Sequence, residues 1–79
     1  MAEQRTLGVE VPHLRLWRVR KLVKQSDLAK AAGVSRFTVQ RAERGERISF
    51  DNVRKLAAAL GITLDQLRYQ APREGGEDK

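Results

Sequence analysis

The sequence predicts an all-α fold, in which five short helices form one small bundle. Three observations indicate it. Apolar residues recur every three or four positions between residues 14 and 67, which is the spacing of one helix face. They never alternate with polar residues over a run, as they would in a half-buried strand. Glycines interrupt the pattern where helices commonly end, at Gly33, Gly45 and Gly61.

The first three helices are short. Pro12 favours the first turn of a helix, because the N–H groups there have no partner within the helix. The good helix formers of residues 27–32 predict a second helix that stops at Gly33. Ser35 then supplies the N-cap oxygen for a third helix over about residues 36–43.

A longer fourth helix and a short fifth helix follow. Ser49 is the candidate N-cap of the fourth helix, whose inner face is expected to carry Val53, Leu56, Ala57 and Leu60. Thr63 and Gln66 have the spacing of a capping box at the start of the fifth helix. These helices define one domain over residues 11–70. Residues 1–10 are expected to be a flexible N-terminal arm, and residues 71–79 a disordered acidic tail.

Positive charge is concentrated in the middle of the chain. The net charge is +6, and residues 15–47 hold ten lysines and arginines against three acidic residues. This segment favours a polyanionic partner such as nucleic acid, because neutralising phosphates releases their condensed counterions. A merely solvated surface is the alternative.

The composition excludes several classes of chemistry. There is no cysteine and one histidine, His13, so neither a disulfide nor a thiolate or multi-histidine metal site is available, and we expect no cofactor. No nucleophile with a base, and no paired carboxylates, point to an enzyme. No apolar run approaches the ~18 residues of a membrane span, so we expect a cytoplasmic protein without membrane association.

Residues 25–45 carry the most specific pattern. Two short helices that cross over a tight turn need a small residue where they approach, a glycine in the turn and a branched apolar residue in the shared core. Ala29, Gly33 and Val39 stand at these positions, with Ala42 one turn later. The spacing predicts a helix-turn-helix, whose second helix can enter the major groove of DNA.

The chain resembles the Xre-type helix-turn-helix family, which includes phage repressors and Cro proteins. The matching phrases are Leu28-Ala29, Ala32-Gly33-Val34-Ser35, Glu43-Arg44-Gly45 and Leu56-Ala57-Ala58-Ala59-Leu60-Gly61-Ile62. The resemblance implies a phage-repressor-like five-helix domain with the helix-turn-helix in helices 2 and 3. It also implies a transcription regulator that binds double-stranded DNA, usually as a homodimer on a palindromic operator.

The resemblance places the residues after the turn beside the base edges. The base-contact candidates are Arg36, Phe37, Gln40 and Arg41. The arginine fork matches guanine, and the alternative for Arg36 and Arg41 is a contact with phosphate. The glutamine amide matches adenine, and the alternative for Gln40 is a solvent-facing helix residue. Phe37 either packs on a thymine methyl group or fills the core edge or a dimer contact.

The remaining family positions are structural or contact phosphate. The phosphate candidates are Lys24, Gln25, Ser35, Thr38, Arg44 and Arg47. The alternative for Lys24, Arg44 and Arg47 is a solvated side chain. In the family, the position of Gln25 also buttresses the recognition helix, and the alternative for Gln25 is the ordinary polarity of a helix start. Arg18 and Glu43 match a family pair that forms an internal ion pair. The chain departs from the family at Leu22, where glycine is common, and at Lys24, where a Ser or Thr cap is common.

The resemblance leaves the partner open. Surplus apolar residues on the first and fifth helices are candidates for a dimer face, namely Leu16, Val19, Leu64, Leu67 and Tyr69. The alternative function is an antitoxin-like or other protein-interaction module, which neutralises a partner protein and binds its own promoter.

Overall fold

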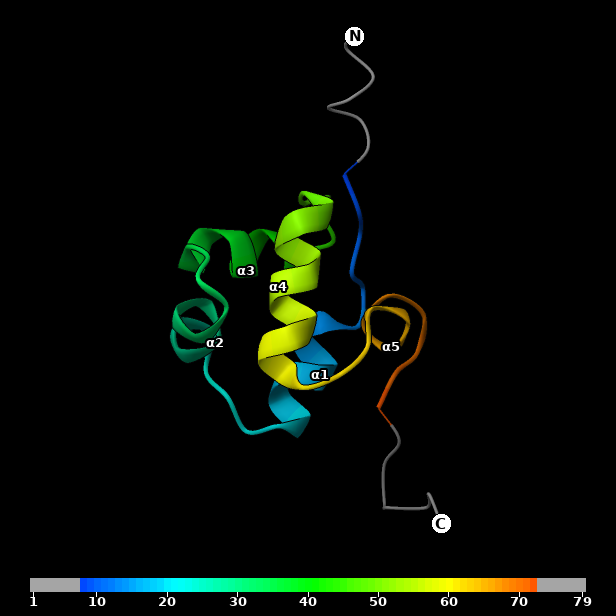
Figure 1. Ribbon diagram of the computed structural model, residues 1–79, viewed down its shortest axis with the longest axis horizontal. Helices are drawn as coiled ribbons and strands as arrows, with labels where there is room; N and C mark the ends of the chain where they lie inside the picture. Colours follow the sequence, from blue (N-terminus) through cyan, green and yellow to red (C-terminus); the bar gives the residue numbers. More distant parts are fainter. Residues whose placement is uncertain (1–7, 73–79) are drawn as a thin grey trace, which may run out of the picture.

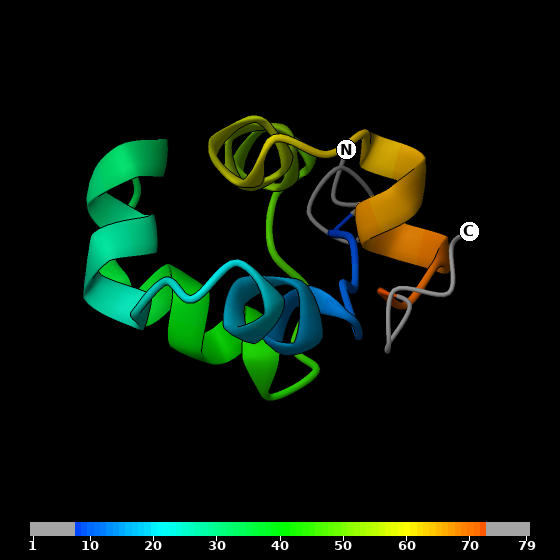
Figure 2. The same ribbon diagram turned by 90° about the horizontal axis from the view of Figure 1, so that it is seen from below.

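The predicted all-α fold is confirmed by the computed structural model, which describes residues 8–72 and has five α-helices there (Figure 1). They are α1 (Leu14–Arg20), α2 (Gln25–Ala32), α3 (Arg36–Glu43), α4 (Phe50–Leu60) and α5 (Leu64–Tyr69). α4 runs through the middle, with α2 and α3 on one side and α5 on the other (Figure 1). In the turned view, α4 lies above α1, with α2 on the left and α5 on the right (Figure 2). Within residues 8–72, no helix has the length and apolar character needed to span a membrane.

A single cluster of apolar side chains fills the space between the helices. Val39 and Ala42 of α3 and Leu14 of α1 are fully buried in it. The predicted inner face of α4 is confirmed, because its members Val53, Leu56, Ala57 and Leu60 are all buried. Each large apolar side chain that is removed from water contributes about 1.5–3 kcal/mol. This cluster therefore fixes which side of α3 faces inward.

The predicted helix caps are present on α3, α4 and α5. The hydroxyls of Ser35 and Ser49 each accept the backbone N–H of the residue three positions on, at 3.1 Å. Thr63 and Gln66 form the capping box, with hydrogen bonds of 2.9 and 3.0 Å. The N-cap residue of α2 is Lys24, where the chain departs from the family pattern, and its side chain makes no capping hydrogen bond.

The turn between α2 and α3 depends on Gly33. Its φ of 76° lies in the left-handed region, where a side chain would cost about 1–2 kcal/mol. The N–H groups of Gly33 and Val34 both donate to the carbonyl oxygen of Ala29, at 2.9 and 3.0 Å. Ala29 is only 4% exposed, and its small side chain fits where the two helices approach. The predicted roles of Ala29, Gly33 and Val39 are therefore confirmed.

The domain begins earlier in the chain than the predicted boundary at residue 11. Val9 is buried, and its backbone exchanges two hydrogen bonds with Ile48, of 2.7 and 3.0 Å, in an antiparallel bridge. This pairing of distant residues leaves no periodic signal in the sequence. The rest of the predicted arm, residues 1–7, and residues 73–79 of the predicted tail lie outside the described residues.

Trp17 joins α1 to the end of α5. Its indole N–H donates to the carbonyl oxygens of Gln66 and Gln70, at 3.2 and 2.8 Å. Leu67 is fully buried and Leu64 packs against the core, so these two close the core and do not form a free dimer face. Leu16, Val19 and Tyr69, the other dimer-face candidates, are exposed.

Leu22 ends α1 in a conformation that suits glycine better. Its φ is 61°, and its side chain is 91% exposed, so it gains little from packing. A left-handed leucine costs about 1–2 kcal/mol, of which the greater unfolded-state freedom of glycine cancels about half. We expect Leu22→Gly to raise the melting temperature by about 3–6 °C in thermal denaturation followed by circular dichroism. Leu22→Ala, which keeps the Cβ atom, should leave it nearly unchanged, and an equal rise in both variants would contradict this explanation.

Candidate nucleic-acid interface

The outer side of α3 presents a continuous arc of polar and aromatic side chains. Successive residues of a helix turn by about 100°, so the five side chains of this outer arc share roughly 140° of the circumference. In angular order they are Arg36, Gln40, Arg44, Phe37 and Arg41. Gln40 is half-buried and the other four are exposed. The buried Val39 and Ala42 occupy the opposite side, so packing of α3 on the core directs the outer arc to solvent.

The two hydroxyl groups at the start of α3 bond to each other and to the backbone. Ser35 Oγ lies 3.1 Å from Thr38 Oγ1 and also accepts the N–H of Thr38. These bonds fix the first turn of α3 and use part of the hydrogen-bonding capacity of both phosphate candidates. The exposed hydroxyl of Ser35 still lies at the N-terminus of the helix, which favours an anion.

A part-buried ionic network holds α3 against α1 and α2. The Nε and Nη2 atoms of Arg18 donate to the two carboxylate oxygens of Glu43, so the pair is bidentate. Arg18 Nη1 also donates to the carbonyl oxygen of Val23, at 2.9 Å. The side chains of Arg18 and Glu43 are 13% and 6% exposed. Such a geometry orients the guanidinium and carboxylate planes, and therefore the end of α3.

Gln25 belongs to the same network. Its Nε2 donates to Glu43 Oε1 at 3.0 Å, and its side chain is half-buried. An amide nitrogen has two hydrogens, so one remains for another acceptor. Among the predicted phosphate candidates, Gln25 is thus the one whose side chain is braced against α3.

Glu46 is a residue that sequence reasoning missed. It accepts hydrogen bonds from Arg41 Nε at 3.2 Å and from Arg44 Nη2 at 3.1 Å, so one carboxylate pairs with two members of the outer arc. The backbone places it there, because the N–H of Glu46 donates to the carbonyl oxygen of Arg41. Within residues 8–72 no carboxylate lies within 4 Å of Arg36.

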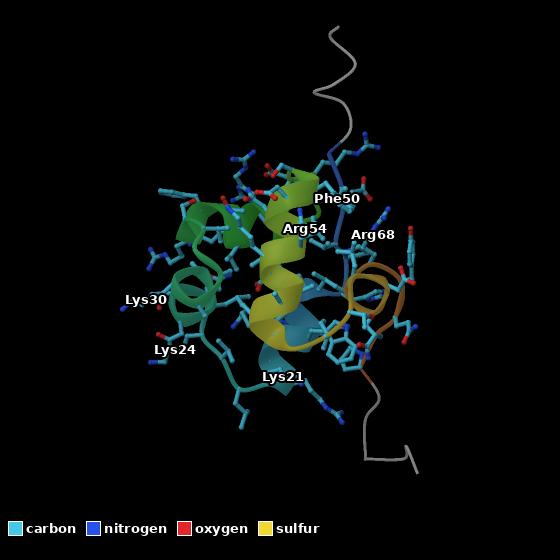
Figure 3. All side chains as sticks on the ribbon, in the orientation of Figure 1. Lys21, Lys24, Lys30, Phe50, Arg54 and Arg68 are labelled. Carbon is cyan, nitrogen blue, oxygen red and sulfur yellow. The ribbon has the colours of Figure 1, made fainter. Side chains whose placement is uncertain are left out.

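Cations outside the outer arc come from α2 and from the segment that follows α3. Lys24, at the start of α2, and Lys30, near its end, point outward from that helix in Figure 3. Arg47 follows α3 and is 60% exposed, with Glu10 at 3.5 Å from its Nε. Exposed pairs of this kind contribute at most about 1 kcal/mol, so Arg47 can exchange this partner for a phosphate at little cost.

A short helix that packs across a glycine turn onto a second, exposed helix defines the class of helix-turn-helix domains. The comparison with protein families agrees with this geometry. A family model described as helix-turn-helix matches residues 14–67. The chain belongs to the helix-turn-helix family, in its Xre/Cro-like group.

Three relatives illustrate the similarity. A hypothetical transcription factor from Neisseria meningitidis is 39% identical over 66 residues, which cover 82% of this chain and 62% of that protein. The restriction-modification controller protein C.AhdI from Aeromonas hydrophila is 41% identical with a TM-score of 0.66, over 70% of this chain and 85% of its own. The DNA-binding domain of the P22 C2 repressor is 26% identical with a TM-score of 0.71, over 81% and 87%. The chain thus spans less than two thirds of the Neisseria protein.

Proposed function

We propose that this chain is a sequence-specific regulator of transcription that places α3 in the major groove of double-stranded DNA. The observation that carries the proposal is the outer arc of α3, where three arginines and a glutamine face solvent while the core holds the opposite side. The relatives support it, because one is a transcription factor by name and another is a DNA-binding domain.

The proposal assigns some side chains to base edges and others to phosphates. Arg36 and Arg41 present the fork that donates to O6 and N7 of guanine, and Gln40 matches the edge of adenine. The phosphate contacts fall on Lys24, Gln25, Ser35, Thr38, Arg44 and Arg47. These contacts provide most of the affinity and set the register of the protein on the duplex.

We further propose that two copies bind together. A single small module buries little surface on DNA, whereas a dimer addresses two half-sites about 34 Å apart. The exposed apolar residues of α1 and α5, among them Leu16, Val19 and Tyr69, are the candidate surface for the second copy. The role is that of a binding protein and not of an enzyme, and we place it in the cytoplasm with the DNA.

Selection of bound sequences from a random DNA pool tests the proposal. We expect an enriched motif with two-fold symmetry, and an affinity that falls steeply with salt. An enriched motif without two-fold symmetry would contradict the proposed dimer and leave sequence-specific binding intact. A pool without any enriched motif would overturn sequence-specific binding. Co-purification of the product of a neighbouring gene with the chain would favour the protein-interaction module.

Glu46 is expected to restrain DNA affinity, because its carboxylate competes with the DNA for both arginines, with a base edge for Arg41 and with a phosphate for Arg44. Replacing Glu46 with glutamine should raise the affinity for specific and random DNA alike, by about three-fold to ten-fold at low salt, and steepen its salt dependence. Titrations of labelled duplexes at two salt concentrations measure the change. Asp65→Asn removes one exposed charge from α5 and should have a much smaller effect. Equal gains in both variants would show that net charge alone is responsible.

A further inference from the structure

We propose that Phe37 reads the methyl group at C5 of a pyrimidine in the major groove. The operator would then contain a thymine whose methyl group contributes to affinity, and a cytosine at that place would bind better when methylated. This inference rests on the proposed function, because it concerns the same face of α3.

The position of Phe37 carries the inference. It is the second residue of α3, and its side chain is 71% exposed, so the alternative that it fills the core edge is wrong. By helical rotation it lies inside the outer arc, between Arg44 and Arg41. Any surface that covers the arginines of the outer arc therefore also covers this phenyl ring.

The chemistry of the outer arc separates Phe37 from its neighbours. Arg36, Gln40, Arg41 and Arg44 all end in hydrogen-bonding groups. A phenyl ring offers neither a donor nor an acceptor to a base edge, and it contributes nothing favourable to a phosphate. The one apolar feature of the major groove is the methyl group of thymine, which apolar side chains contact. In 5-methylcytosine a methyl group stands at the same ring position.

The neighbouring Thr38 does not offer the same contact. Its hydroxyl lies 3.1 Å from Ser35 Oγ, its backbone N–H bonds to that oxygen, and its side chain is half-buried. Within the exposed first turn of α3, the large carbon surface belongs to Phe37.

The test begins with the sequence selected from the random pool. Each thymine is replaced in turn by deoxyuridine, which lacks only the methyl group. We expect one position in each half-site at which the affinity of the wild-type chain falls about four-fold, the value of one buried methyl group. In a duplex with cytosine at that position, replacing cytosine with 5-methylcytosine should raise the affinity by about the same factor. Phe37→Ala should bind the thymine and deoxyuridine duplexes equally.

The control is Leu22→Gly, which removes another exposed apolar side chain outside the helix-turn-helix and should keep the response to the methyl group. An enriched operator that is indifferent to deoxyuridine at every position would overturn the inference and leave the proposed function intact. An equal deoxyuridine effect in wild type and Phe37→Ala would also overturn it. The same holds if sedimentation shows a dimer for the wild type and a monomer for Phe37→Ala, because Phe37 would then be a dimer contact. Failure to enrich any sequence would overturn both proposals.

Discussion

Replacing Glu43 with alanine is expected to lower the free energy of unfolding by about 3 kcal/mol, because the change leaves the Arg18 guanidinium, which is only 13% exposed, without its carboxylate. Gln25 loses its acceptor at the same time. Domains of this size have a total stability of only about 5–15 kcal/mol, so this is a large fraction. Thermal denaturation should show a melting temperature lower by about 12–24 °C.

A double replacement separates the contribution of the charges to stability from the contribution of side-chain packing. Arg18→Met with Glu43→Leu removes both charges and keeps apolar volume, so it should recover much of the loss. Glu46→Gln breaks exposed pairs only, and its stability should stay within about 1 kcal/mol of the wild type. A Glu43→Ala variant as stable as Glu46→Gln would show that the buried pair does not hold α3 in place.

Replacing Arg36 with alanine is expected to weaken binding to the selected operator by about 1–3 kcal/mol, or roughly five-fold to 150-fold, and to relax the preference at one base pair. Arg36 is the first residue of α3, and no carboxylate of the described residues competes for it. Its fork is therefore free to meet a guanine edge. Affinities for operator variants, measured at one salt concentration, give the loss of base preference. Affinities for random DNA at the same salt concentration give the loss of non-specific binding.

Two further variants distinguish a base contact from a phosphate contact. Arg36→Lys keeps the charge but loses the fork, so it should lose specificity while keeping most of the non-specific affinity. Arg44→Ala should weaken operator and random DNA alike, because the proposal assigns Arg44 to a phosphate. Equal losses on operator and random DNA for Arg36→Ala would reduce Arg36 to a phosphate contact.

Local rules of the chain account for what the sequence predicted. The inner face of α4 follows from periodicity, the caps at Ser35, Ser49 and Thr63 follow from single side chains, and the turn at Gly33 follows from one allowed backbone conformation. The pairing of Arg18 with Glu43 came from the family resemblance and not from spacing.

The features that the sequence did not predict depend on contacts between distant segments or on the path of a loop. Val9 meets Ile48 across the whole helix-turn-helix, and no local pattern marks such a pairing. Glu46 reaches Arg41 and Arg44 only because the chain turns back after α3.

The division of α3 into a packed side and a solvent side has an evolutionary consequence. Val39 and Ala42 hold the helix in the fold, whereas Arg36, Phe37 and Arg41 face solvent and fill no part of the interior. Surface substitutions of this kind usually change stability by less than about 0.5 kcal/mol. Under the proposed function, a lineage can therefore acquire a new DNA target by a few changes on the solvent side of α3, without first having to restabilise the domain.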